Sequence, residues 1–209
     1  DLGYTVEDIK DLLRSYGFSV SSMENEYHWF CEKQEIEKPY TEVQNTAVSY
    51  VQGDITSFSA DAAINSVGSS LYFGTGVAGA LRKSAGESLQ QSVLEHTPLT
   101  VSDSIITNGY NSPYTYLIHA ASMPHYREGQ STKASIYKSV SNSIQIANKH
   151  PEIQSIVCPA VGCGLGGVPL TNGIQKILQA INMNDTTNID TIRICLYSED
   201  EYETINTIY

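Results

Sequence analysis

The amino-acid sequence predicts an α/β protein: a three-layer α/β/α sandwich with a mixed, mostly parallel sheet, preceded by a small N-terminal α+β appendage. From residue 46 onward, short apolar runs typical of strands alternate with amphipathic helical patterns. Two glycine-rich segments, 74–76 and 162–167, each lie between a strand pattern and a helical pattern. The first 45 residues lack this alternation and contain the single Trp.

Residues 1–45 are predicted to form the appendage or the tail of a preceding domain, and residues 46–209 the main domain. Apolar residues at helical spacing as far as Tyr16 predict a helix that begins at Thr5. Two short strand-like runs and a polar stretch complete this part. Because the chain starts at Asp1 and without Met, we expect it to be a fragment of a longer protein.

The predicted strands of the main domain are short runs rich in β-branched and aromatic residues, bounded by Gly, Asn, Asp or Ser. They are residues 47–51, 62–65, 104–107, 114–119, 156–158 and 191–196. Helices are predicted where apolar residues recur every three or four positions or where acidic residues follow a Ser. They are residues 76–85, 132–149, 174–181 and a terminal helix after Ser198.

Composition excludes several classes of protein. The 209 residues are 41% apolar, which is enough for a core, and the net charge of −11 disfavours unspecific binding to nucleic acid or anionic membranes. No membrane-length apolar run or signal peptide is present. The four cysteines have no zinc-like spacing, so we predict no metal and no cofactor, and a reducing, cytoplasmic location.

The segment 162–167 has four glycines in six residues and connects a strand to a helix. This is how α/β proteins build a cradle for a diphosphate, because glycine lets backbone N–H groups approach the anion and the helix start adds positive partial charge. The alternative is an ordinary tight turn. A second glycine segment at 74–76 makes the cradle the better interpretation.

Polar residues gather at the carboxyl ends of the predicted strands, where open α/β sheets bind ligands. Asp54 follows the first strand and suits a hydrogen bond from an exocyclic amine, while Tyr197 follows the last and suits stacking on a base. The alternative for Tyr197 is core packing. Together with the glycine loops, these residues predict a site for a dinucleotide-like ligand, although another phosphorylated metabolite remains an alternative.

Five stretches in order resemble the macro domain family, whose members bind ADP-ribose in an α/β/α sandwich. The resemblance covers residues 46–209. The stretches are Gly53-Asp54-Ile55-Thr56, Asp61-Ala62-Ala63-Ile64-Asn65, Gly74-Thr75-Gly76-Val77-Ala78-Gly79-Ala80-Leu81, Tyr116-Leu117-Ile118-His119-Ala120 and Pro159-Ala160-Val161-Gly162-Cys163-Gly164-Leu165-Gly166.

The resemblance implies a role for each matched position. Asp54 corresponds to the adenine-selecting acid, Ile55 to a wall of the adenine pocket, and Tyr197 to the aromatic residue stacked on adenine. Asn65 corresponds to the first Asn of the family's Asn-Ala-Ala-Asn, beside the distal ribose. The phosphate loops correspond to Gly74, Gly76 and Val77, and to Gly162, Cys163, Gly164, Leu165 and Gly166.

The sequence also departs from the family pattern. Gly68 replaces the second Asn, and Ala78 replaces the Asp of MacroD-type hydrolases. A second hydrolase branch uses a Lys and an Asp, which are His119 and Gly166 here. No catalytic residue is therefore assigned; His119 and the nearby His125 are candidate bases, and the alternative for His119 is an ordinary strand-end role. Gly68 is expected to leave room for a bulkier group at the distal ribose.

We therefore expect a module that binds or senses ADP-ribose or a related NAD-derived nucleotide rather than an enzyme. The ligand is expected to be linked to a protein or to be a free signal, as in bacterial antiphage effectors. ADP-ribosylated proteins are candidate partners. The alternative is a mono-ADP-ribosyl hydrolase with atypical residues, in which the substrate assists the attack of water.

Overall fold

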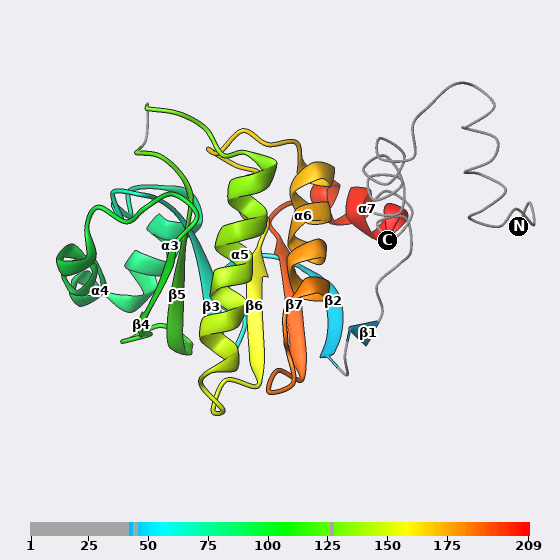
Figure 1. Cartoon of the computed structure of the whole chain (residues 1–209), viewed down its shortest axis with the longest axis horizontal. Coiled ribbons are helices and arrows are strands. Elements are labelled where there is room, and N and C mark those ends of the chain that lie inside the picture. The colour runs from blue at the N-terminus through cyan, green and yellow to red at the C-terminus, as the bar shows by residue number, and fades with distance from the viewer. Residues whose placement is uncertain (1–41, 44–45, 126–127) are drawn as a thin grey trace, which may run out of the picture. The chain divides into compact units, whose positions relative to one another are not determined.

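A computed structural model of the chain describes residues 42–43, 46–125 and 128–209 (Figure 1). Within these ranges one sheet has seven strands. They are β1 (Glu42–Val43), β2 (Thr46–Gln52), β3 (Ala60–Gly68), β4 (Ser104–Asn108), β5 (Tyr114–Met123), β6 (Ser155–Pro159) and β7 (Thr191–Leu196). The helix predicted between Thr5 and Tyr16 lies outside the described residues, and the predicted boundary at residue 45 stays a prediction.

Five α-helices are described, together with two 3₁₀ turns. The helices are α3 (Gly76–Ala85), α4 (Glu87–Val93), α5 (Lys133–Asn148), α6 (Leu170–Met183) and α7 (Glu199–Ile208); the turns are η1 (Ile55–Ser57) and η2 (Leu94–His96). Capping boxes at Thr132 and Ser198 begin α5 and α7. Helix α4 was not predicted, since its seven polar-rich residues are too few for a clear period.

The sheet has the order β1-β2-β7-β6-β3-β5-β4. Its five central strands are parallel, and the outer pairs β1–β2 and β4–β5 are antiparallel. This confirms the predicted mixed, mostly parallel sheet. The pairing of β1 with β2 brings two residues upstream of Thr46 into the sheet.

Two apolar clusters lie on opposite faces of the sheet and account for the three layers. Helices α5, α6 and α7 cover one face, with α5 and α6 in front in Figure 1, and α3 and α4 cover the other. Successive residues of β3 alternate between the clusters, with Ala62 and Ile64 in one and Ala63 and Val67 in the other. The predicted α/β/α sandwich is confirmed.

Strand β3 is longer than predicted and continues three residues past Asn65, as far as Gly68. Asn65 interrupts the apolar alternation, which is why the sequence pattern ended there. Its side chain is fully buried on the face that also buries Ala63 and Val67, and it pairs in register with His119 of β5. A pair of buried polar residues therefore lies inside the sheet.

Candidate functional site

Four parallel strands, β2, β7, β6 and β3, are neighbours, so their carboxyl ends lie along one edge of the sheet. From this edge the loop between β6 and α6 rises at the top of Figure 1. Neighbouring strands are about 4.8 Å apart, so the ends of β2 and β3 are separated by about 14 Å. Asp54, Tyr197 and both glycine segments follow these four strands. The predicted site residues therefore share one edge of the sheet.

Asp54 lies at the β2 end of this edge, is exposed, and caps η1. Its Oδ1 accepts hydrogen bonds from the Thr56 backbone N and from Thr56 Oγ1, both at 2.8 Å. No hydrogen bond from the described part of the chain reaches Oδ2. One carboxylate oxygen is thus fixed by the protein, and the other can accept a hydrogen bond from a ligand.

The turn that carries Asp54 is tied to two strands. The Gly53 N donates to the carbonyl of Leu196, at the end of β7, at 2.9 Å. The hydroxyl of Tyr114, a buried residue of β5, donates to the carbonyl of Ile55. Ile55 is only 4% exposed, and its predicted place in an adenine pocket stays a prediction.

Tyr197 follows β7, next to the turn of Asp54, and 74% of it is exposed. Its backbone is fixed: the N donates to Glu201 Oε2 at 2.9 Å, and the carbonyl accepts from Gln52 Nε2 at 3.3 Å. The alternative of core packing is therefore wrong. The ring stands on a rigid backbone with a face open for stacking.

The first loop, residues 69–75, leads from β3 into α3. Gly76 opens the helix with φ +59°, a left-handed conformation that favours glycine. Thr75 is the N-cap but makes no side-chain capping bond. Within the described ranges, the backbone N–H groups of Gly76, Val77 and Ala78 have no partner, as expected for an uncapped helix start. Three N–H groups and the helix dipole are thus available to an anion.

Two buried residues and the side chain of Gln90 fix the backbone of the first loop. Leu71 and Phe73 are fully buried and alternate with the exposed residues Tyr72 and Gly74. The side-chain amide of Gln90 accepts from the Phe73 N and donates to the Leu71 carbonyl, both at 2.9 Å. The backbone is therefore fixed directly before Gly74.

The second loop, residues 160–169, follows β6 and has three more unpaired donors. No described residue accepts from the backbone N–H of Gly164, Leu165 or Gly166. Gly164 is exposed, and an added Cβ there would meet nothing within 4 Å. Gly166 is buried, and a Cβ there would overlap the Ser131 hydroxyl. The loop therefore packs tightly at one glycine and presents open backbone at another.

The two loops are linked by a residue that the sequence did not single out. The N–H of Gly162, at φ +76°, donates to Ser66 Oγ at 3.3 Å. Ser66 belongs to β3 and precedes the first loop, while Gly162 lies in the second. No pattern marked Ser66, since it occupies an Ala position of the family motif.

Cys163 packs beneath the second loop. Its Sγ lies 3.6 Å from the Val161 carbonyl, and burial raises the pKa of this thiol to about 12. The thiol therefore stays protonated near neutral pH and is a poor nucleophile. Its contribution to the site is packing.

The family model of the macro domain matches residues 64–177, more than half of the 209 residues, and includes both glycine segments. The chain belongs to the macro domain family. A macro domain-containing protein of Chlorobaculum tepidum is 27% identical over 162 residues, which are 76% of this chain and 93% of that protein.

Solved macrodomain structures have the same fold. The Trypanosoma brucei macrodomain in complex with ADP-ribose has a TM-score of 0.68 at 22% identity, covering 77% of this chain and 68% of that one. The Oceanobacillus iheyensis macrodomain with ADP has a TM-score of 0.66 at 24% identity, covering 80% and 92%. At these identities the similarity establishes the fold alone.

Within this macro domain, the position of His119 prevents it from acting as a catalytic base. It is fully buried, its Nδ1 lies 3.0 Å from Asn65 Nδ2, and its Nε2 lies 2.9 Å from Thr107 Oγ1. Burial, with a smaller contribution from His96, lowers the pKa of His119 to about 3. A buried imidazole with both nitrogens occupied cannot take a proton from a ligand-bound water.

Asn65 lies in the same buried layer and not at the end of its strand, so its predicted place beside a distal ribose stays a prediction. Its Oδ1 meets no donor in the described part of the chain. The donor of the same amide is used by His119. Asn65 therefore joins strands β3 and β5 behind the first loop.

The expectation of extra room at Gly68 is not supported. A register shift after Val67 brings the end of β5 over this residue, and the Ser69 N donates to the Met123 carbonyl at 2.9 Å. A Cβ on Gly68 would lie 2.8 Å from the carbonyl oxygen of Pro124. The space that a side chain would need is filled by backbone, which explains the glycine.

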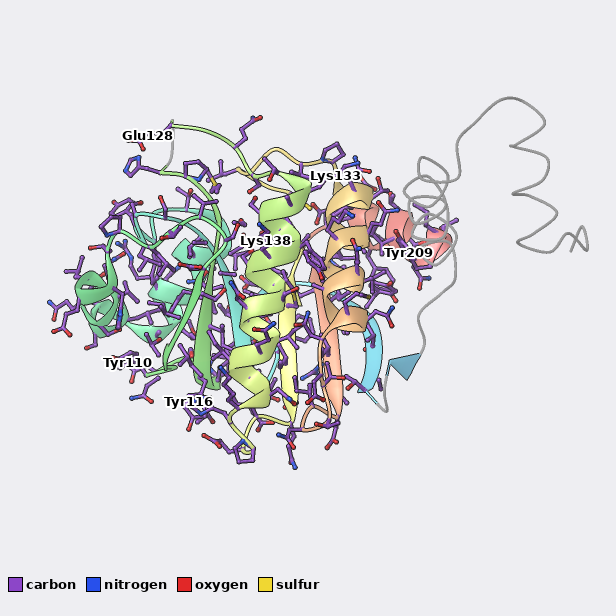
Figure 2. The ribbon with its side chains drawn as sticks, viewed as in Figure 1. Tyr110, Tyr116, Glu128, Lys133, Lys138 and Tyr209 are labelled. Carbon is purple, nitrogen blue, oxygen red and sulfur yellow. The ribbon has the colours of Figure 1, made fainter. Side chains whose placement is uncertain are left out.

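A surface hollow of about 520 Å³ lies away from this edge, over α5 and the end of α6. Lys138, on the face of α5 toward the viewer in Figure 2, is one of its lining residues. The hollow adjoins neither glycine loop and contains no residue that follows a parallel strand. We therefore place the candidate site at the carboxyl edge, where the unpaired backbone donors gather.

Proposed function

We propose that this macro domain binds ADP-ribose or a closely related adenine nucleotide. The observation that supports this most strongly is the pair of backbone segments with unpaired N–H groups, Gly76–Ala78 and Gly164–Gly166, at the ends of two adjacent strands. Each offers three unpaired N–H groups, which suits the two phosphates of a diphosphate.

The remaining features of the edge follow the order of such a ligand. Beyond the second loop come Tyr197 and then Asp54, an exposed ring and an open carboxylate oxygen. These suit an adenine, which stacks through its face and donates from its amino group. The macrodomains of Trypanosoma brucei and Oceanobacillus iheyensis were solved with ADP-ribose and ADP. These precedents favour the same ligand class here.

We propose further that hydrolysis is absent or inefficient. His119 is buried, and the pKa of Cys163 is raised, so neither offers a base or nucleophile at the edge. Positions 68, 78 and 166 hold Gly, Ala and Gly in place of the polar residues used by hydrolases that this chain resembles. A positioned general base contributes about 10²–10⁴ in rate.

A binder without turnover fits a reader of ADP-ribosylated proteins or a sensor of a free NAD-derived signal. We place this function in a reducing, intracellular compartment, because Cys158, Cys163 and Cys195 are all free thiols. No helix in the described ranges is long and apolar enough to cross a membrane. In the same ranges no group of three or more His, Cys, Asp or Glu side chains could hold a metal ion.

Calorimetry against ADP-ribose, ADP, NAD, adenosine and ribose 5-phosphate tests the proposal. We expect saturable binding of ADP-ribose with one site, weaker binding of adenosine, and no binding of ribose 5-phosphate alone. Equal affinity for a diphosphate that lacks adenine would overturn the proposed adenine selection.

A second assay separates the binder from the hydrolase. The protein is incubated with substrates mono-ADP-ribosylated on Glu/Asp or on Ser. Retention of the modified protein without release supports the binder. Release of ADP-ribose over several turnovers per minute would establish the hydrolase with substrate-assisted attack.

A further inference from the structure

Three adjacent strands are joined by one imidazole in the layer beneath α3. His119 of β5 contacts Asn65 of β3 through Nδ1 at 3.0 Å and Thr107 of β4 through Nε2 at 2.9 Å. His119 and Asn65 are fully buried. Hydrogen bonds among buried groups of this kind hold their partners in one arrangement.

The direction of these hydrogen bonds follows from their chemistry. Asn65 Nδ2 can only donate, so His119 Nδ1 accepts and the proton of the neutral ring lies on Nε2. That N–H donates to Thr107 Oγ1, and the Thr107 hydroxyl donates in turn to the Asn108 carbonyl at 3.1 Å. The ring N–H and the Thr107 hydroxyl each have one acceptor, which fixes the ring's tautomer and its orientation.

The face of this fixed ring supports the first loop. The rings of His119 and Phe73 are stacked, with centroids 5.1 Å apart and planes inclined by 21°. Phe73 is fully buried and directly precedes Gly74, and its backbone N donates to the side-chain amide of Gln90. The orientation of His119 therefore constrains the backbone that leads into the unpaired N–H groups at the start of α3.

We propose that His119 is a positioning residue for the anion-binding first loop, acting as the neutral Nε2–H tautomer through Phe73. Its role in the ligand site is to fix where the donors of residues 76–78 point. The inference rests on the proposed function for its ligand, but its structural part is independent of any ligand. It also accounts for a histidine inside the sheet that cannot serve as a base.

Thr107→Val tests the proposal, with Thr107→Ser as the matched control. Valine keeps the shape of the side chain and removes the acceptor of the Nε2–H, whereas serine keeps the hydroxyl. We expect Thr107→Val to weaken ADP-ribose binding about three- to tenfold and to leave adenosine binding unchanged, because adenosine is held at the ends of β2 and β7. Thr107→Ser should bind both ligands like the parent.

Nuclear magnetic resonance of the ligand-free protein supplies the second measurement. The parent should show His119 protonated on Nε2 alone, and the amides of residues 74–78 should shift in Thr107→Val but not in Thr107→Ser. Phe73→Leu, which removes the stacked ring, serves as a second variant with the same expected pattern. An Nδ1–H tautomer, unshifted loop amides, or equal loss of ADP-ribose and adenosine would overturn the proposal. If the parent binds no ADP-ribose, the proposed function fails, while the tautomer and amide shifts still decide the positioning role.

Discussion

The two ends of the candidate site are built from different parts of the chain. At the β2–β7 end, the expected contacts come from two exposed side chains, the Asp54 carboxylate and the Tyr197 ring. Hydrogen bonds hold the backbone at both positions. At the β6–β3 end, they come from the backbone N–H groups of Gly76–Ala78 and Gly164–Gly166. Recognition of the base therefore depends on residue identity, and recognition of phosphate on backbone shape.

This difference predicts how each end fails. A side chain can be truncated at the adenine end with a graded loss of affinity. A backbone donor cannot be removed by substitution, so the phosphate end fails only when a new side chain blocks it or its support shifts.

The largest effect is expected from Gly164→Val. The branched side chain would stand where phosphate must approach, and its Cβ would meet no protein atom within 4 Å. ADP-ribose affinity should fall more than about 100-fold, or about 3 kcal/mol, with an unchanged melting temperature. Calorimetry and thermal unfolding measure the two quantities, and Gly164→Ala should give an intermediate loss. Parent-like binding by the valine variant would show that the second loop does not bind the phosphates.

Gly76 is a poorer position for the same experiment. An added Cβ would also meet nothing within 4 Å, but φ is +59°, where a side chain strains the backbone. A loss of binding there would mix occlusion with strain. The contrast between the two glycines is visible only in the structure.

The next effect is expected from Asp54→Asn, which tests the adenine end. Asparagine keeps an oxygen to cap η1 but replaces the open carboxylate oxygen by a donor. Affinity for ADP-ribose should fall by about 1–3 kcal/mol, as for a lost hydrogen bond to a charged group. Calorimetry measures the loss, and Asp54→Ala, which also removes the cap, should add a drop in melting temperature. Unchanged affinity in both variants would show that the adenine pocket is misplaced.

Tyr197→Ala should have a smaller effect, because the loss of stacking on a base costs about 1–3 kcal/mol and a surface position recovers part of it through solvation. Tyr197→Phe keeps the ring and should bind like the parent. Neither change should alter the melting temperature, since the side chain is 74% exposed. Fluorescence titration with ADP-ribose distinguishes the two, and equal affinities for Ala and Phe would exclude stacking.

The last prediction concerns pH and the buried support of the phosphate end. The pKa of His119 is lowered to about 3, whereas an unfolded histidine titrates near 6.5. Below pH 6.5, His119 takes up a proton in the unfolded chain but not in the folded protein. The contribution of the neutral His119 to the free energy of unfolding is therefore fully present above this pH and is lost as the pH falls toward 3. The slope is at most about 1.4 kcal/mol per pH unit.

Urea unfolding at pH 7.5, 6.0 and 5.0 measures this dependence. His119→Gln removes the titrating group and should show a shallower loss of stability between pH 6 and 5 than the parent. Identical slopes in parent and variant would show that other groups dominate acid unfolding.

The comparison of the two ends also explains what the sequence could predict. The phosphate end is marked by glycines at 74–76 and 162–167, because left-handed turns and close approach select glycine. The adenine end is marked by a polar residue after each of two apolar strands. Both patterns are local, and so is the alternation of strands and helices that predicted the sandwich.

What the sequence could not predict depends on contacts between distant residues. Phe73, Gln90, His119 and Thr107 meet only after β3, β5, β4 and α4 have assembled, and none lies in a motif that marks the contact. The position of Pro124 over Gly68 depends on a register shift between two strands. An absent side chain was therefore taken for open space, although backbone fills it.

The carboxyl ends and the amino ends of the parallel strands lie at opposite ends of the sheet. Figure 2 shows Glu128 and Lys133 at the top, near the loops of the candidate site, and Tyr110 and Tyr116 at the opposite end. Tyr116 and Lys138 are thus useful reference positions for any mapping of a ligand, because neither belongs to the carboxyl edge.

The most direct test of the proposed binding site is a titration of the ¹⁵N-labelled protein with ADP-ribose, followed through its backbone amide resonances. We predict that the amides of residues 76–78 and 164–166 shift together with those of Asp54 and Tyr197 at one shared dissociation constant, while the amides of Tyr116 and Lys138 do not shift. Shifts confined to Lys138, Asn142 and the other residues of the hollow over α5, with the glycine loops unmoved, would contradict it.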